Sequence, residues 1–222
     1  MGTRDRRDRE REQVRRRIMD AARELFVRDG YEAVSMRRIA EAIEYSPTAI
    51  YLHFKDKAEL MRAICDADFA SLFQRMRELG SIGDPVERIR QLGLLYVRIA
   101  VEHPNHFRLM FMTRPHPELM ERSPDEARQR GQGDPERDGY AFLRLSAEQA
   151  IKEGRFRTEF RDSHQAAQLF WAAVHGVAAL HVTRVEGDPW CPWRGTDKLA
   201  RLMVDTVMRG VLADQPKKRG RR

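Results

Sequence analysis

Four histidines are the side chains in this sequence with the most obvious capacity to bind a metal. His103 and His106 are three residues apart, and His175 and His181 are six apart. These spacings match no metal-binding signature, because zinc sites draw three or four ligands from recurrent short motifs. We therefore expect no metal site. We interpret His175 as a buried residue bonded to a carbonyl, or as a polar anchor for a ligand.

Motifs for enzymatic catalysis are also missing from the sequence. It has no phosphate-binding loop, no G-x-S-x-G and no H-E-x-x-H. Its two cysteines, Cys65 and Cys191, form no close pair, which favours a reduced, cytoplasmic setting. The first 17 residues are mostly charged, unlike a signal peptide. We expect a cytoplasmic protein that is not an enzyme and needs no cofactor.

Basic residues are concentrated at the two ends of the chain. The formal net charge is +7; residues 1–62 contribute +3, residues 214–222 contribute +4, and the middle is neutral. Clustered basic residues attract nucleic-acid phosphates, so the N-terminal end is the expected place for such a contact. We expect residues 1–13 to be a disordered charged arm and residues 214–222 a disordered, solvated basic tail.

The stretch Ser35–Phe54 predicts two short helices joined by a tight turn. Ser35 and Ser46 are good N-caps, and Pro47 suits the first helical position, where its missing N–H is not needed. Ile50 and Phe54 would anchor the second helix at an i, i+4 spacing. Helices this short are not stable alone. The pattern is therefore typical of a helix-turn-helix docked on a longer neighbour.

The rest of the chain predicts an all-α fold of about nine helices. A long helix precedes the pair, from about residue 12 to 28, and others follow, with no convincing strand or repeat. We expect a DNA-binding domain at residues 14–58 and a larger helical domain at residues 59–213. The Pro- and Gly-rich stretch 114–138 is expected to be a loop, with a helical turn at Pro117–Arg122.

The apolar segment Ala166–Val182 has 17 residues, fewer than the roughly 20 that usually span a membrane. Gln168, His175 and His181 also interrupt it, so we favour a helix in a soluble protein. A ridge of small residues on it would let another helix approach closely, either in a partner subunit or within the chain. The ridge consists of Ala172, Gly176, Ala179 and Thr183.

Ile18–Tyr31, Ser35–Ala42 and Ser46–Lys57 together resemble the DNA-binding domain of the TetR family of transcriptional regulators. The FWAAVHG run at Phe170–Gly176 and the run His103–Phe111 are similar to the WHG-type C-terminal domain of that family. The resemblance implies a homodimer that binds a palindromic DNA operator and is released by a small-molecule effector. A constitutive or architectural DNA-binding dimer without a ligand response is the alternative.

The resemblance also implies roles for individual residues. Base-reading positions fall on Arg37, Pro47, Thr48, Ala49 and Leu52, and phosphate-binding positions fall on Ser46, Tyr51, His53 and Lys57. Candidates for the effector pocket are Phe73, Tyr96, His103, Phe107, Met110, Phe111, Tyr140, Trp171 and His175, although for each of them ordinary core is the favoured interpretation. The expected dimer interface combines the ridge with Leu199, Met203, Thr206 and Gly210 of the last helix.

The turn departs from the family pattern at Glu44, where glycine is usual. A non-glycine residue at positive φ costs on the order of 1 kcal/mol. Either the turn tolerates that strain, or it is built differently with Tyr45 as a buried plug. We slightly favour the second arrangement.

Overall fold

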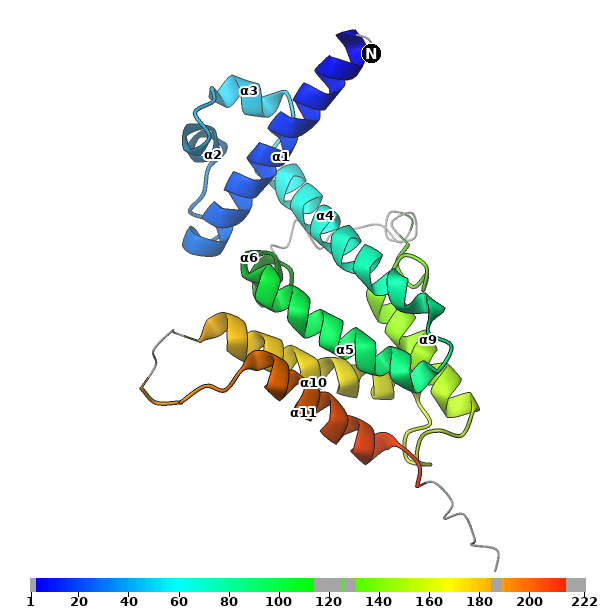
Figure 1. Ribbon diagram of the computed structural model, residues 1–222. Coiled ribbons are helices and arrows are strands. Elements are labelled where there is room, and N and C mark those ends of the chain that lie inside the picture. The colour runs from blue at the N-terminus through cyan, green and yellow to red at the C-terminus, as the bar shows by residue number, and fades with distance from the viewer. Residues whose placement is uncertain (1–2, 114–124, 126–130, 185–188, 215–222) are drawn as a thin grey trace, which may run out of the picture. The chain divides into compact units, whose positions relative to one another are not determined.

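The computed structural model describes residues 3–113, 125, 131–184 and 189–214 (Figure 1). Those residues form nine α-helices, one 3₁₀-helix and one π-helix, and within them β pairing is limited to an isolated bridge between Phe156 and Leu212. The predicted all-α class is therefore confirmed. The predicted turn at Pro117–Arg122 and the tail after Asp214 lie outside the described residues.

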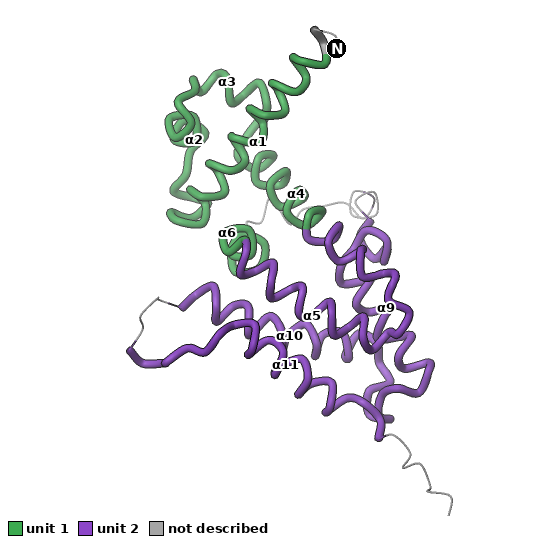
Figure 2. The backbone as a smooth tube through the Cα atoms, in the orientation of Figure 1, with its two compact units in different colours: residues 1–71, 103–124 green, residues 72–102, 125–222 purple. Residues whose placement is uncertain are grey.

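The chain divides into two compact units, coloured separately in Figure 2. Unit 1 comprises residues 1–71 and 103–124, and unit 2 comprises residues 72–102 and 125–222. Unit 1 thus extends beyond residue 58, where the sequence pattern places the end of the DNA-binding domain. One reason is that Leu109, far along the chain, is buried in the hydrophobic core of this unit.

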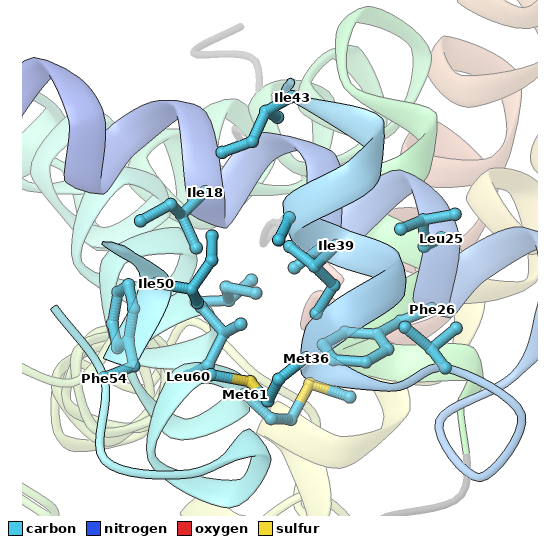
Figure 3. Close-up of a cluster of buried hydrophobic side chains, with 14 of the residues drawn as sticks. Ile18, Leu25, Phe26, Met36, Ile39, Ile43, Ile50, Phe54, Leu60 and Met61 are labelled. Carbon is cyan, nitrogen blue, oxygen red and sulfur yellow. The ribbon is translucent and has the colours of Figure 1, made fainter. Parts of the chain in front are cut away.

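Unit 1 contains α1 (Thr3–Asp29), α2 (Met36–Ala42), α3 (Pro47–Tyr51) and most of α4 (Lys57–Arg77), followed by α6 (Pro104–Phe107) and the π-helix η2 (Arg108–Met112). One face of each of the first four helices meets in a common core (Figure 3). Ile18, Ile39 and Ile50 are fully buried there, together with Leu60 and Ile64. This packing fixes the two short helices that could not be stable alone.

Three helix starts in unit 1 have side-chain N-caps, and those at Ser35 and Ser46 are as predicted. Ser35 Oγ accepts from Arg38 N and Ser46 Oγ accepts from Ala49 N, both at 3.2 Å. Pro47 occupies the first turn of α3. Asp56 Oδ1 accepts from Glu59 N at 2.7 Å at the start of α4. Each cap satisfies a backbone donor that has no partner within its helix.

The end of α2 overturns the arrangement that we favoured for the turn. Glu44 has a φ of 59°, in the left-handed region. Its N–H bonds to Glu41 O, and Tyr45 N–H bonds back to Ala40 O at 2.9 Å, which together form a Schellman motif. Helix α9 (Gly139–Lys152) ends in the same pattern, but with Gly154 at the left-handed position, φ 67°. The turn at Glu44 is therefore a normal helix stop that bears an unfavourable residue.

Replacing Glu44 with glycine is expected to stabilise the protein by about 0.5–1 kcal/mol, because relief of the strain outweighs the extra freedom of glycine in the unfolded chain. Urea unfolding of the full chain measures the change. Glu41→Gly is the matched control: it places glycine inside α2 and is expected to cost about 1 kcal/mol. An unchanged or lower stability of Glu44→Gly would contradict the strain.

The expected disorder of the N-terminal arm is wrong for the residues that the structure describes. Helix α1 begins at Thr3, about nine residues before the predicted start. Within this extension Arg6 pairs with Glu10 at 3.3 Å, and Arg9 Nε donates to Asp5 O at 3.1 Å. Pairs at i, i+4 stabilise helices, and propagation from an anchored helix avoids the cost of nucleation.

Unit 2 contains the 3₁₀-helix η1 (Glu78–Ser81), α5 (Pro85–Glu102), α9, α10 (Ser163–Thr183) and α11 (Thr196–Val211). α5 and α10 pack against each other and against both α9 and α11. A Cβ on Gly93 would lie only 3.1 Å from Val174 and 3.2 Å from Val204, so glycine permits this close packing. The N-cap of α11 is Gly195.

Among the described residues, α10 is the helix that is long and apolar enough to cross a membrane. Length and composition alone are weak evidence, because core helices of soluble proteins have the same properties. Only 39% of its most apolar window is buried, although the helix packs on three others. Much of the apolar surface of α10 is therefore left uncovered within the single chain.

Candidate nucleic-acid interface and effector cluster

Helices α2 and α3 present most of the predicted base-reading residues to solvent. Arg37, Pro47 and Thr48 are exposed, Leu52 is 72% exposed, and Ala49 is partly buried. The opposite side of α3 is anchored by Ile50, which is fully buried. Arg37 Nε pairs with Glu41 Oε1 at 2.9 Å, but both side chains remain largely exposed. A guanidinium in such a solvent-exposed pair is weakly held and can exchange its partner for a base edge.

The four predicted phosphate-binding residues differ in how far they are already engaged. Ser46 is an exposed N-cap and Tyr51 is 54% exposed. Lys57 Nζ donates to Tyr31 O at 2.7 Å and lies 4.1 Å from the Tyr31 ring centroid. Lys57 therefore also holds the start of α4 to the segment after α1. An ammonium has three donors, so a phosphate contact remains possible beside this bond.

Arg15 links α1 to the end of α3. Its Nη1 donates to His53 O at 3.0 Å, and its guanidinium lies 4.1 Å from the centroid of the Phe54 ring. Burial lowers the pKa of the His53 imidazole, and the positive charges of Arg11 and Arg15 lower it further. His53 is therefore uncharged at neutral pH and suits a hydrogen-bonding role better than an ionic one.

A buried ion pair that the sequence did not reveal lies in unit 1. Arg23 Nη2 and Nε bond to the two carboxylate oxygens of Asp68 at 2.7 and 3.0 Å, and both side chains are at most 7% exposed. Arg23 also bonds to Asp20 at 2.7 Å, and His106 Nδ1 lies 3.0 Å from Asp68 Oδ1. Burial opposes the charge of Arg23, but the bonds to Asp68 and then Asp20 raise its pKa. No sequence signal marks a pair separated by 45 residues.

Three of the predicted pocket residues form a hydrogen-bonded group in unit 2. The hydroxyl of Tyr96 accepts the indole N–H of Trp171 at 3.2 Å and lies 2.9 Å from His175 Nδ1. One partner of His175 is thus a phenol hydroxyl. Burial raises the pKa of Tyr96 strongly and lowers that of His175, so both groups are neutral at neutral pH. We call Tyr96, Trp171 and His175 the effector cluster.

Other predicted pocket residues lie beside this cluster or in the other unit. Tyr140 stands with its ring 6.1 Å from that of Trp171, whereas Phe73 packs edge-on against Phe142. Four others, His103, Phe107, Met110 and Phe111, belong to unit 1. There Phe107 is 2% exposed and is ordinary core. Unit 1 also contains a groove of about 430 Å³, and none of the predicted pocket residues lines it. Its lining is Glu24, Val27, Arg28, Asn105 and Arg108.

The small-residue ridge of α10 lies on the exposed side of the helix. Ala172, Gly176 and Thr183 are exposed and Ala179 is partly buried. On α11, Thr206 and Gly210 are exposed, and Leu199 and Met203 are partly buried. Sequence analysis missed three large apolar side chains that flank these residues and are 40–51% exposed: Leu169, Leu180 and Leu202. We call this combined surface the α10–α11 face.

The histidines are engaged in ordinary contacts. The rings of His103 and His106 lie 5.3 Å apart, and His181 Nδ1 lies 2.8 Å from Thr196 Oγ1. Across the part of the chain that the structure describes, no group of three or more His, Cys, Asp or Glu side chains could hold a metal ion.

Two family models match the sequence. Residues 18–64 match that of the bacterial regulatory proteins of the tetR family, and residues 89–207 match that of the tetracyclin repressor-like C-terminal domain. The second match alone covers more than half of the chain. The first match spans α2, α3 and most of the residues that bury them. The second spans the effector cluster and all of the α10–α11 face except Gly210.

Curated relatives are similar over about a third of the chain. The transcriptional regulator UidR of Escherichia coli K12 is 38% identical over 65 residues, which are 29% of this chain and 33% of UidR. The transcriptional repressor AcnR of Corynebacterium efficiens is 37% identical over 68 residues, 31% of this chain and 36% of AcnR. The match thus spans about a third of the length of these relatives.

Solved structures show the same fold over nearly the whole chain. A TetR-family regulator from Marinobacter aquaeolei VT8 has a TM-score of 0.71 and 20% identity, with 95% of this chain and 100% of that one covered. The TetR-family regulator PfmR of Thermus thermophilus has a TM-score of 0.64 and 22% identity, with 86% and 97% covered.

Proposed function

Since the chain belongs to the TetR family and is a DNA-binding transcriptional regulator, we propose that it is a ligand-responsive repressor. In this proposal a homodimer binds a palindromic operator and leaves it when a small hydrophobic molecule binds. The main support is the construction of α3, which exposes Thr48, Tyr51 and Leu52 while Ile50 anchors it from behind. A short helix held in this way can enter a major groove.

Base recognition depends on Arg37 more than on α3. The exposed residues at the start of α3 are small or apolar and suit thymine methyl groups, whereas Arg37 can form two hydrogen bonds with a guanine edge. Ser46, Tyr51, His53 and Lys57 then hold the phosphates on either side. We assign DNA binding to residues 14–58 and effector binding and dimerisation to residues 59–213.

Replacing Arg37 with alanine is expected to remove about 1–3 kcal/mol of discrimination at one operator position, since the guanidinium is the main donor to a base. Lys57→Ala should instead weaken binding to all sequences and reduce the slope of log affinity against log salt by about 1. The full chain is first used to select a duplex from a random pool. Competition among single-base variants of that duplex, repeated across salt concentrations, then measures the base discrimination and the salt dependence of each variant. If both variants bind like the parent, the assigned DNA face is wrong.

The α10–α11 face supports dimerisation. Leu169, Leu180 and Leu202 surround small residues that allow two helices to approach closely, and such exposed apolar patches are typical of protein interfaces. A two-fold axis through this face would form a four-helix interface from two copies of α10 and α11. It would bring two DNA-binding heads into one particle, as a palindromic operator requires.

The effector cluster supports a ligand that is mainly apolar with a polar group. Trp171 offers aromatic surface, and the shared hydroxyl of the buried Tyr96 offers a hydrogen-bonding centre. Trp171 remains 38% exposed in the free protein, so it can contact an incoming molecule. A ligand that binds one dimer geometry better than the other would shift the population away from the DNA-bound form.

Thermal unfolding in the presence of hydrophobic compounds separates this function from a constitutive DNA-binding dimer. A ligand of the effector cluster should raise the melting temperature of the parent and of Trp190→Phe, a loop control, but not that of Trp171→Ala. It should also release operator DNA. An unchanged melting temperature across a broad panel of hydrophobic compounds would favour the constitutive DNA-binding dimer. Neither Cys65 nor Cys191 forms a disulfide, which accords with the proposed reduced, cytoplasmic location.

A further inference from the structure

The N-terminal part of α1 is a helical extension that precedes the packed core of unit 1. Val14 is the first residue of α1 that packs against this core. Residues 3–13 therefore form three further turns, and at 1.5 Å per residue they add roughly 16 Å of helix. Figure 1 shows this part of α1 continuing past α3. Folding of the head does not require these turns, so another role can explain them.

The charges of the extension are arranged by face. Arg7, Arg11 and Arg15 follow one another at intervals of four residues and share one side of the helix. Arg7 and Arg11 are exposed. Asp8 and Glu12 lie on the neighbouring strip, and there Glu12 pairs with Arg16 at 3.2 Å. On the other flank of these arginines Glu10 pairs with Arg6. We call Arg7, Arg11 and Arg15 the basic strip.

The basic strip begins at the end of the recognition helix. Arg15 is bonded to the carbonyl of His53, two residues after α3 ends. The charges of Arg11 and Arg15 both act on the His53 ring, which places this side of α1 beside α3. From there the strip runs outward along α1 to Arg7. A duplex bound by α3 would thus meet the strip next to the base pairs that α3 contacts.

We propose that the basic strip binds the phosphates of DNA that flanks the operator half-site, beyond the base pairs that α3 contacts. This inference rests on the proposed function, because it needs α3 to bring the duplex to this side of the head. Arginines spaced along a helix can follow a phosphate backbone, and such contacts add affinity without sequence preference. An acidic protein partner is the competing occupant that the experiment must distinguish.

The test compares a minimal operator with the same operator lengthened by eight base pairs at each end. The minimal duplex is the shortest one that the full chain selects from a random pool, and two unrelated flanking sequences are used. Fluorescence anisotropy measures the affinity across a range of salt concentrations. The variants are Arg7→Gln with Arg11→Gln, and a matched control, Arg6→Gln with Arg9→Gln, which removes the same charge from other faces.

The parent is expected to bind the lengthened duplexes about tenfold more tightly, whichever flank is used. The strip variant should lose this gain and bind the minimal duplex like the parent. For the strip variant on long duplexes, the slope of log affinity against log salt concentration should become shallower by about 0.9 for each phosphate that the variant no longer neutralises. The largest expected change is about 3.6, for two arginines in each of two subunits. The control should keep most of the gain.

Equal affinity of the parent for short and long duplexes would overturn the inference and leave the proposed function intact, and would favour a protein partner for the strip. An equal loss in both double variants would also overturn it, because general charge would then explain the gain. Failure of the parent to select any duplex would overturn the proposed function and this inference with it.

Discussion

Replacing Asp68 with alanine is expected to lower the free energy of unfolding by about 3–5 kcal/mol. The change leaves the guanidinium of Arg23 buried without the carboxylate that accepts two of its hydrogen bonds. Asp20 offers only partial compensation, since its own side chain is 68% exposed. The substitution also removes the acceptor beside His106 on α6. Urea unfolding followed by circular dichroism measures the effect.

Two further variants show whether the buried charge causes the loss. Glu41→Ala removes the partner of Arg37 from an exposed pair and should change stability by less than about 1 kcal/mol. Arg23→Met combined with Asp68→Leu removes both charges and should be clearly more stable than Asp68→Ala alone. If the double variant is at least as unstable as the single one, the cost arises from poorer packing and not from an unpaired charge.

Replacing Gly176 with arginine is expected to convert the proposed dimer into a monomer and to weaken operator binding at least about 100-fold. A long charged side chain on the α10–α11 face prevents close approach of a second copy. Binding then loses the gain of about 10²–10⁴ that two linked heads provide. A Cβ at this position meets nothing within 4 Å, so the single chain can accept the side chain. Sedimentation and operator binding are the two measurements.

The folded chain itself should not suffer from this substitution. Arginine has a higher helix propensity than glycine, so the melting temperature of the monomer should hold or rise, apart from any contribution lost with the dimer. Gly83→Arg is the control: Gly83 also has open space around its Cβ, but it lies outside α10 and α11. A Gly176→Arg protein that stays dimeric and binds the operator normally would exclude this face as the interface.

Local features of the fold could be predicted because a few neighbouring residues decide them. The N-caps at Ser35 and Ser46 depend on one side chain and a donor three residues ahead, and both were predicted correctly. Glu44 was identified as the unusual position in the turn, but the favoured arrangement was wrong. The Schellman bonds of α2 determine its φ, and they outweigh the preference of one residue.

Features that depend on the whole fold could not be predicted. Arg23 and Asp68 are 45 residues apart and resemble any other charged residues of an amphipathic helix until α1 and α4 pack. The aromatic character of Phe107 suggested a pocket as readily as a core, and only its burial distinguishes the two. The ridge of α10 was identified by its small residues, but the exposure of Leu180 beside it requires the positions of α5, α9 and α11.

The arrangement of α10 has a mechanical consequence. Trp171 and His175 of the effector cluster each immediately precede a residue of the α10–α11 face, Ala172 and Gly176. The effector cluster and the α10–α11 face thus share the rigid backbone of α10 and differ only in the side of the helix on which they lie. With side-chain tips about 5–6 Å from the axis, a roll of roughly 10° would displace both surfaces by about 1 Å. In the proposed dimer, a ligand that turns α10 about its axis would therefore shift one subunit against the other directly, with no chain of intermediate contacts to relay the motion.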